Sequence, residues 1–437
     1  MAAFSDLDAA PSAFGAQRRQ APLLSLSLLI AAFFLGRFNQ SSLYPLQEAM
    51  AAAKGLTDND VALLHGPAFI LPFVILSIPV GMAVDRALRA PLLIAALLMG
   101  AIGSVATAYA DSLATMFQGR ALVGLSTSAV TVTAFSMISD IFPAEQRGRA
   151  KSAADVAGQI GGSAAFLFGG FLLAARGDGG QGWRSALLIM TMPLVVGAVL
   201  LLALREPVRT ERQVVGSSTG QMLAELRPCL PLILPLIMGA VLIEIPIIAA
   251  FTWGAPILTR SFSLSAAEVG GIMGAILLLS GLAGPILCGL LSDVCYRAGG
   301  PRKAIGAVVL LIFVSTPGAL FVAAPSAAIA AIILGLFMTC LIGALSMIVT
   351  AFTIIIPGQL RGLCLSMLSA SAAVGGVALA PLLISWLSVA FGGPAMIGKA
   401  LACICIPSSL LTCASLLLGM RSLARIGDKP PGRVIGP

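Results

Sequence analysis

The first candidates for chemistry are two charged residues that stand inside long apolar stretches of this 437-residue chain, Arg120 and Glu244. Arg120 lies about two turns into the stretch 114–141, and Glu244 lies deep in the stretch 228–258. An arginine at the centre of a membrane helix costs about 2.5–3.5 kcal/mol, so such residues usually face a partner or a water-filled cavity. A carboxylate buried without a cation takes up a proton. Arg120 therefore predicts an anion-binding position, and Glu244 predicts a coupling group that carries a proton.

Polar residues follow Arg120 on one face of the predicted helix. Thr127 and Thr131 come seven and eleven residues later, which places all three side chains on one side. We expect this face to line water or substrate. The alternative for Arg120 is an anchor that snorkels to the membrane surface. The alternative for Glu244 is a structural carboxyl group bonded to a neighbouring helix, and both alternatives stay open.

The first apolar stretch offers four polar positions: Arg37, Asn39, Gln40 and Tyr44. Side chains at 37 and 39 point about 200° apart on a helix of 3.6 residues per turn. They cannot both face the centre of one cavity. Geometry alone does not choose between them.

The elements that must position these residues follow from composition. The chain is 58% hydrophobic and 10% charged, whereas soluble domains carry about 25% charged residues. A soluble protein is excluded, and about 20 apolar residues per span predict a polytopic, all-α protein in a lipid bilayer. Twelve stretches are expected to be helices: 22–46, 61–83, 91–110, 114–141, 151–174, 184–204, 228–258, 266–292, 303–323, 327–356, 362–391 and 396–420.

The positive charges predict the orientation of these spans. The net charge is +8, and in a membrane protein Lys and Arg gather in cytoplasmic loops. With both termini cytoplasmic, the cytoplasmic segments hold 19 of the 26 Lys and Arg residues, the opposite side holds five, and two lie inside spans. We expect a multi-pass protein of the inner or plasma membrane, a monomer with no nucleic-acid partner.

The chain lacks the residues that several kinds of chemistry require. The chain has one histidine, and its eight cysteines form no CxxC pair, so no metal site is expected. No glycine-rich loop with a Lys and a Ser or Thr is present for a nucleotide. We expect neither an enzyme nor a cofactor.

Two short motifs recur at half the length of the chain. The loop Pro143–Gly148 (PAEQRG) returns as Pro357–Gly362 (PGQLRG), and Gly161-Gly162 returns as Gly375-Gly376, each 214 residues later. Parallel repeats of this kind place a substrate path between two homologous bundles. The predicted units are an N-terminal tail (1–21), a six-helix bundle (22–204), a cytoplasmic linker (205–227), a second bundle (228–420) and a C-terminal tail (421–437).

Three segments resemble the major facilitator superfamily. Gly81-Met-Ala-Val-Asp85-Arg86-Ala-Leu-Arg89 resembles its G-x-x-x-D-R-x-x-R signature after the second helix, Arg120-Ala-Leu-Val-Gly124 its fourth-helix motif, and Gly182-Trp183-Arg184 the entry to its sixth helix. The resemblance implies twelve transmembrane helices in two pseudo-symmetric six-helix bundles with one central cavity. The stretch from Leu35 to Gly170 looks most like the Spinster-like branch, which is associated with export of amphipathic lipids.

The resemblance also selects residues. The family's acidic residue in the first helix falls on Asn39, and its glutamate in the fourth helix falls on Thr127. The usual proton-carrying pair is therefore missing, while the basic residue is kept. The residues expected to bind substrate are Arg120, Asn39, Thr127, Thr131 and Tyr44, and Glu244 is the candidate for coupling.

Charged loop residues on the cytoplasmic side are candidates for a gate. They are Asp85, Arg86, Arg89, Arg147, Asp293, Arg297 and Arg361. We expect them to form contacts when the cytoplasmic side closes, or, as the alternative, to be a solvated cluster that only sets the orientation.

The expected function is secondary transport of a small organic solute, anionic or zwitterionic, by alternating access and with a coupling proton. One alternative is a Spinster-like exporter of lysolipids, sphingolipid-type or drug-like molecules. An alternative of another class is a membrane sensor or scaffold that kept the fold and lost transport, since both expected carboxylates are absent.

Overall fold

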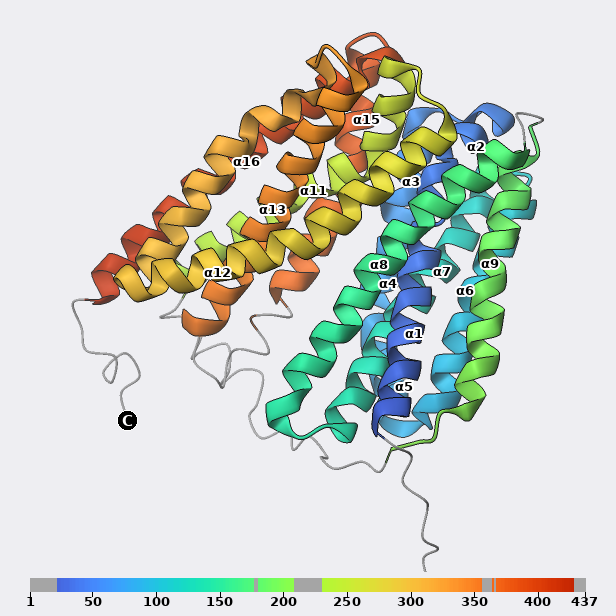
Figure 1. Cartoon of the computed structure of the whole chain (residues 1–437), viewed down its shortest axis with the longest axis horizontal. Helices are drawn as coiled ribbons and strands as arrows, with labels where there is room; N and C mark the ends of the chain where they lie inside the picture. Colours follow the sequence, from blue (N-terminus) through green and yellow to red (C-terminus); the bar gives the residue numbers. More distant parts are fainter. Residues whose placement is uncertain (1–21, 177–179, 208–229, 356–363, 365–366, 428–437) are drawn as a thin grey trace, which may run out of the picture.

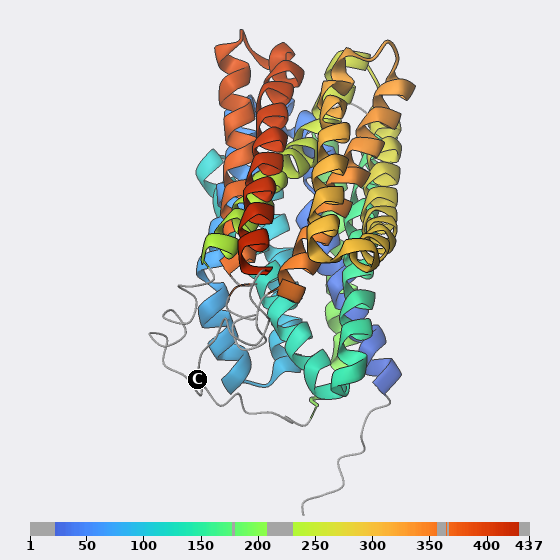
Figure 2. The same ribbon diagram turned by 90° about the vertical axis from the view of Figure 1, so that its left-hand side faces the viewer.

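The structure is a computed structural model that describes residues 22–176, 180–207, 230–355, 364 and 367–427. Within these ranges all the regular elements are helices. They form two groups that lie close together at one end of the molecule and diverge toward the other (Figure 1, Figure 2). We call these ends the converging end and the diverging end. The expected tail 1–21, most of the linker 205–227 and the last residues of the chain lie outside the described ranges.

The first group contains the helices that precede the linker. They are α1 (Pro22–Ser41), η1 (Tyr44–Leu46), α2 (Gln47–Lys54), α3 (Asp58–His65), α4 (Pro67–Ile75), α5 (Ser77–Arg86), α6 (Arg89–Tyr109), α7 (Leu113–Ile141), α8 (Ala144–Arg176), α9 (Gly182–Leu200) and η2 (Leu201–Ala203). The second group contains α11 (Leu230–Phe262), α12 (Ala266–Ser315), η4 (Thr316–Ala323), α13 (Ala327–Ile355), η5 (Ala373–Leu379), α15 (Ala380–Ala390), η6 (Pro394–Met396) and α16 (Ile397–Gly427).

These helices account for the twelve predicted spans. Ten of the described helical segments are long and apolar enough to cross a membrane, or eleven when the bent pair Asp58–Ile75 and Ser77–Arg86 counts as one. The segment Ala266–Ala323 counts as one span, but it turns at Gly300, where φ is 66°. Dividing it there gives the two predicted spans 266–292 and 303–323, and hence twelve. The all-α membrane fold predicted from composition is confirmed.

Several helices are longer than the apolar stretches that predicted them. The stretch 151–174 belongs to α8, which already begins at Ala144, and the stretch 396–420 belongs to α16, which continues to Gly427. The added turns carry charged residues such as Arg147 and Arg421. Hydropathy marks only the part of a helix that lies in lipid, whereas the helix itself extends into the polar region.

Local sequence explains where three helices begin. The helices α3, α7 and α12 each start at a capping box, in which Thr57, Ser112 and Ser265 are the N-caps. In each box the N-cap hydroxyl accepts a hydrogen bond from the backbone three residues later, and that residue's side chain accepts one from the N-cap backbone. These exchanges satisfy backbone N–H groups that the first helical turn would leave without partners.

The helix of the second span is interrupted at Gly66. The helix α3 ends at His65, Gly66 has a non-helical backbone conformation (φ −90°, ψ −100°), and α4 begins at Pro67, whose fixed φ and missing N–H suit the first position of a helix. A Cβ on Gly66 would lie 2.9 Å from the Ala378 carbonyl oxygen and 3.0 Å from that of Val377. Only glycine permits this close approach of α4 to η5 in the other group.

The first glycine of each repeated pair makes an equivalent contact in its group. A Cβ on Gly161 of α8 would lie 2.2 Å from the Phe34 carbonyl oxygen of α1. In the second group, a Cβ on Gly375 would lie 2.4 Å from Val241 of α11, and one on Gly376 would lie 2.7 Å from Glu244 Cβ. The repeat found in the sequence therefore corresponds to a repeated close packing of two helices.

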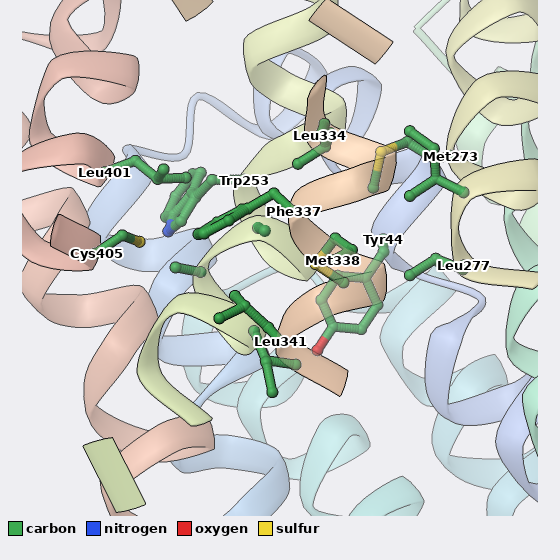
Figure 3. Packing of buried hydrophobic residues seen from close by; sticks show 14 of the residues in the cluster. Tyr44, Trp253, Met273, Leu277, Leu334, Phe337, Met338, Leu341, Leu401 and Cys405 are labelled. Carbon is green, nitrogen blue, oxygen red and sulfur yellow. The ribbon is translucent and has the colours of Figure 1, made fainter. Parts of the chain in front are cut away.

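Apolar side chains cover the outside and also join the two groups. Large apolar residues are exposed on the surface, for example Ile78 and Leu202 at 71% each, as expected for helices that face lipid. One buried cluster contains residues of both groups. Figure 3 shows Tyr44, which follows α1, beside Leu277 of α12 and Met338 of α13. This cluster holds the groups together near the level of the site.

Candidate functional site

Arg120 is enclosed by protein within the first group. It extends from α7 and is 2% exposed. Its Nε donates to the Leu64 carbonyl oxygen and its Nη2 to that of Gln40, both at 3.4 Å. The guanidinium lies 5.6 Å from the ring centre of Phe69. These long contacts to neutral groups leave the charge of Arg120 without a carboxylate among the contacts that the described residues provide.

An aromatic stack lies next to Arg120. The rings of Tyr44 and His65 are 4.0 Å apart and stacked, and the edge of Phe251, from α11, meets Tyr44 at 4.6 Å. Arg120 interacts electrostatically with both Tyr44 and His65. Sequence reasoning did not place His65 in the site. The signal that could have found it is its position directly before Gly66-Pro67, where the second span breaks.

His65 has unused hydrogen-bonding capacity. The residue is completely buried, and neither ring nitrogen has a partner within the described residues. Buried polar atoms are almost always bonded in native proteins, so an unpartnered pair beside an uncompensated arginine needs an explanation. An anionic group bound between Arg120 and His65 would give Arg120 a counter-charge and would accept a hydrogen bond from the N–H of the His65 ring.

The polar residues expected beside Arg120 lie in different surroundings. Thr127 is buried and donates to the Val123 carbonyl oxygen of its own helix at 2.9 Å, and Thr131 donates to that of Thr127 at 2.8 Å. Asn39 is buried against α6, where its Oδ1 accepts a bond of 2.7 Å from Ser104. The structure therefore brings Tyr44 to Arg120 but packs Asn39 between helices of the first group.

Arg37 occupies the opposite side of α1 from Asn39. Its Nη1 donates to Gln40 Oε1 at 2.8 Å, and its stem crosses α8 at Gly158, where a Cβ would lie 3.0 Å from Arg37 Cγ. The side chain is exposed, so it borders space that water can enter. Arg37 interacts electrostatically with Asp155 of α8 and with Glu244 of α11.

Glu244 faces the first group from α11. Its side chain is half-buried, and its Cβ packs against Gly376, which lies in the π-helical turn η5. Turns of this kind frequently occur at functional sites. Among the described residues, Arg37 is the charged group with which Glu244 interacts. The partner that the sequence left undefined is thus an arginine on the first helix.

The comparison with protein families decides what kind of protein carries this site. The model of the major facilitator superfamily matches residues 26–256, which is more than half of the chain. The chain belongs to the major facilitator superfamily. It is a multi-pass membrane transporter of this superfamily and not an enzyme, as the three sequence motifs predicted.

Individual relatives are more distant. A protein of Bacillus subtilis (strain 168), "Putative metabolite transport protein YfiG", is 27% identical over 163 residues, which cover 37% of this chain and 31% of that protein. A bacterial homologue of the human lysosomal transporter Spinster, solved in an inward-facing and occupied conformation, has a TM-score of 0.76 at 21% identity, over 93% of this chain and 96% of that chain. A mutant of the nucleoside transporter NupG has a TM-score of 0.72 at 13% identity, over 90% and 99% of the two chains. These two structures share the fold with this transporter.

Arg89, one of the candidate gate residues of this transporter, is buried within the first group. It is 2% exposed, its Nε donates to Glu206 Oε1 at 2.8 Å, and its Nη1 contacts Asp140. The backbone N–H groups of Arg89 and Ala90 also donate to Glu206 Oε2, at 2.8 and 2.9 Å. Arg89 therefore ties the start of α6 to the end of α7 and to the segment after η2.

We expect Arg89→Met to destabilise the transporter. Removing one partner of a buried ion pair costs about 3 kcal/mol or more, and here Asp140 and Glu206 would both lose the guanidinium of Arg89. Thermal unfolding in detergent should show a clearly lower melting temperature. Arg86→Met, a change at an exposed arginine three residues earlier, is the control. An unchanged melting temperature of the Arg89 variant would contradict a structural role.

The other candidate gate residues that the structure describes are more exposed to solvent than Arg89. Asp85, Arg86, Asp293 and Arg297 are exposed, and they belong to α5 and α12 at the diverging end. Arg147 is half-buried, and its Nε donates to the Phe142 carbonyl oxygen at 3.0 Å. Arg361 lies outside the described residues.

A second ion-pair cluster, which sequence reasoning missed, joins the groups at the converging end. Arg260 of α11 donates from Nε and Nη2 to Glu48 of α2 at 2.9 and 2.8 Å, and from Nη1 and Nη2 to Asp58 of α3 at 2.8 and 2.7 Å. Such forked pairs are the strong ones among protein ion pairs. Nearby, a cavity of about 60 Å³ lies between the groups and is lined by Tyr44 and Thr259 among others. The Arg260 cluster therefore bridges the two groups at the converging end.

We expect Arg260→Gln to open the converging end more often. Two carboxylates would lose their cation across the interface, and a change of about 1.4 kcal/mol alters a population ratio tenfold. The measurement is the labelling rate of Thr259→Cys by a membrane-impermeant maleimide, in a background without other reactive cysteines. Lys54→Gln is the matched control, because Lys54 donates to the Ala110 carbonyl oxygen at 2.6 Å and pairs with Asp111 at 3.7 Å, and both of these partners belong to its own group. Equal labelling rates in the two variants would show that the cluster is not a gate.

Proposed function

We propose that this protein is a secondary transporter of a small organic solute that carries an anionic group, alone or as part of a zwitterion. The single observation that carries the proposal is Arg120, a buried arginine whose described hydrogen-bond partners are the backbone carbonyls of Leu64 and Gln40. A charge in such a position is expensive unless something neutralises it. A carboxylate or phosphate on the substrate would supply that charge, with His65 as a second donor.

The proposed transport cycle uses two helical bundles, residues 22–204 and 228–420, joined by the linker 205–227. We further propose that both termini are cytoplasmic, as the distribution of Lys and Arg indicates. The converging end, with the Arg260 cluster, is then the outer face, and the diverging end is the cytoplasmic face. In this assignment the structure corresponds to an inward-facing state with its outer gate closed.

Glu244 is the proposed coupling residue. It packs against the π-helical turn of its own bundle and interacts electrostatically with Arg37 of the other bundle. A carboxyl group there can exist as an ion paired with Arg37 or as a neutral acid. Changing between these forms offers a way to tie proton binding to the movement of the bundles, even though Asn39 and Thr127 stand where the superfamily often has carboxylates.

The decisive experiment is transport by the purified protein in proteoliposomes. We would test labelled carboxylates, phosphorylated solutes, zwitterionic amino compounds and lysolipids, each with and without a proton gradient. The proposal expects accumulation of at least one anionic or zwitterionic solute and its loss when the gradient is collapsed. Binding of such a solute without any movement would indicate a sensor instead and would overturn the proposal.

The second candidate is an exporter of amphipathic lipids or drug-like molecules. The aromatic cluster supports it, because Tyr44, Phe166 and Phe251 contact one another with ring centres 4.6–6.1 Å apart, an environment suited to an acyl chain. The likeness to the Spinster homologue agrees with this candidate through the fold alone. Selective movement of lysolipids in the same panel, with no transport of short carboxylates, would favour it.

A further inference from the structure

The helices α1 and α11 face each other in a matched register. Tyr44 follows α1 and meets Phe251 of α11, and seven residues earlier on each side stand Arg37 and Glu244, which interact electrostatically. Equal steps along both chains mean that the helices run in the same direction. On α11 seven residues are about two turns, or about 10.5 Å, whereas on the other side α1 ends at Ser41 and a short turn leads to Tyr44. The charged pair therefore forms a layer below the aromatic one, on the side of the diverging end.

Arg37 and Glu244 also occupy equivalent places in the two bundles. Three residues before Arg37, Phe34 packs against Gly161, and three residues before Glu244, Val241 packs against Gly375. The two glycines are the repeated pair of the sequence. The two bundles thus present opposite charges from corresponding positions.

Arg37 has a second partner within its own bundle. Asp155 lies on α8 one turn before Gly158, the residue that the stem of Arg37 crosses. Asp155 is exposed, and it interacts electrostatically with Arg37 and with Lys151. One arginine therefore stands between a carboxylate of its own bundle and a carboxylate of the other.

We propose that Arg37 is the positioning residue that couples the charge of Glu244 to bundle closure. Paired with Glu244, Arg37 draws the bundles together at the diverging end, because the attraction between charges grows as their distance falls. Once Glu244 is neutral, Arg37 pairs with Asp155 alone, and that attraction disappears. This inference rests on the proposed function, but it concerns the protein without substrate and can fail separately.

The experiment measures the opening of the diverging end by spin-label distance distributions. One label is placed on Ser152→Cys at the exposed start of α8, and the other on Cys295 near the diverging end of α12. The other seven cysteines are replaced by alanine. The protein is studied in lipid nanodiscs without substrate, and each variant must first elute as a single folded species.

Variants that remove the Arg37–Glu244 attraction and the variant that removes Asp155 should shift the ratio of open to closed forms in opposite directions. Glu244→Gln and Arg37→Gln should each raise the ratio of open to closed forms by roughly fivefold or more. The double variant should differ little from Glu244→Gln, because the same pair is already lost. Asp155→Asn should lower the ratio, since Arg37 then has Glu244 as its remaining partner. Asp111→Asn, at an exposed position in the connection between α6 and α7, should change nothing.

Two results would overturn the inference. The first is a shift of Asp155→Asn and Glu244→Gln in the same direction, which would mean that Arg37 does not choose between them. The second is additivity of Arg37→Gln and Glu244→Gln, which would mean that the two residues act independently. Transport of an anionic solute by the wild type would be untouched by either result, so the proposed function would stand or fall on the uptake assay.

Discussion

Replacing Arg120 with alanine is expected to abolish transport while the protein still inserts and folds. Arg120 is the buried cation that we expect substrate to neutralise. Removing one partner of a buried charge pair costs about 3–5 kcal/mol, which corresponds to a loss of more than about a hundredfold. The measurement is uptake into proteoliposomes of whichever anionic or zwitterionic solute the wild type carries.

Arg184→Ala is the matched control for this prediction. Arg184 also lies 5.6 Å from an aromatic ring, that of Trp183, but it is half-exposed and donates to Gln181. The control should transport normally, which separates the loss of a binding charge from the loss of an arginine beside a ring. Normal uptake by the Arg120 variant would refute the assignment of Arg120 to the substrate.

Replacing Glu244 with glutamine is expected to remove accumulation driven by a pH gradient. Glutamine resembles the neutral form of the acid permanently, so no proton can be released during the cycle. Exchange of labelled for unlabelled substrate should remain measurable, because alternating access does not itself require that release. Accumulation and exchange are measured side by side in the same proteoliposomes.

Glu268→Gln serves as the control, because Glu268 is an exposed carboxylate that caps α12. Its accumulation ratio should match that of the wild type. The competing interpretation makes Glu244 structural. In that case glutamine would keep most of its hydrogen bonds, and both activities would survive. A Glu244 variant that still concentrates substrate against its gradient would rule out this residue as the coupling site.

The spans could be predicted from sequence because lipid imposes one requirement on every segment. A chain in the bilayer core must satisfy all its backbone N–H and C=O groups internally, so each long apolar stretch becomes a helix. This explains why the stretch 114–141 corresponds to α7, Leu113–Ile141, within one residue. The break at Gly66-Pro67 and the turn at Gly300 also coincide with residues that interrupt helices.

The charged residues inside spans were equally visible in the sequence. Arg120 and Glu244 stand out because a charge well inside an apolar stretch is expensive unless a partner or water compensates it. Such positions can be identified from the hydropathy pattern without knowledge of the fold. Their partners could not be predicted from sequence, because a partner depends on which helix packs against the residue and at which level along its axis.

Only the tertiary structure decided those partners. The sequence left Arg37 and Asn39 as alternatives, and the packing of α1 against α6 and α8 turned Asn39 to Ser104 and Arg37 toward Glu244. Arg260 pairs with Glu48 across 212 residues of sequence. Hydropathy and motifs determine which segments become helices, because those depend on local properties. The rotation of each helix and the contacts between bundles arise from side-chain packing between distant segments, and they alone bring one arginine between two carboxylates.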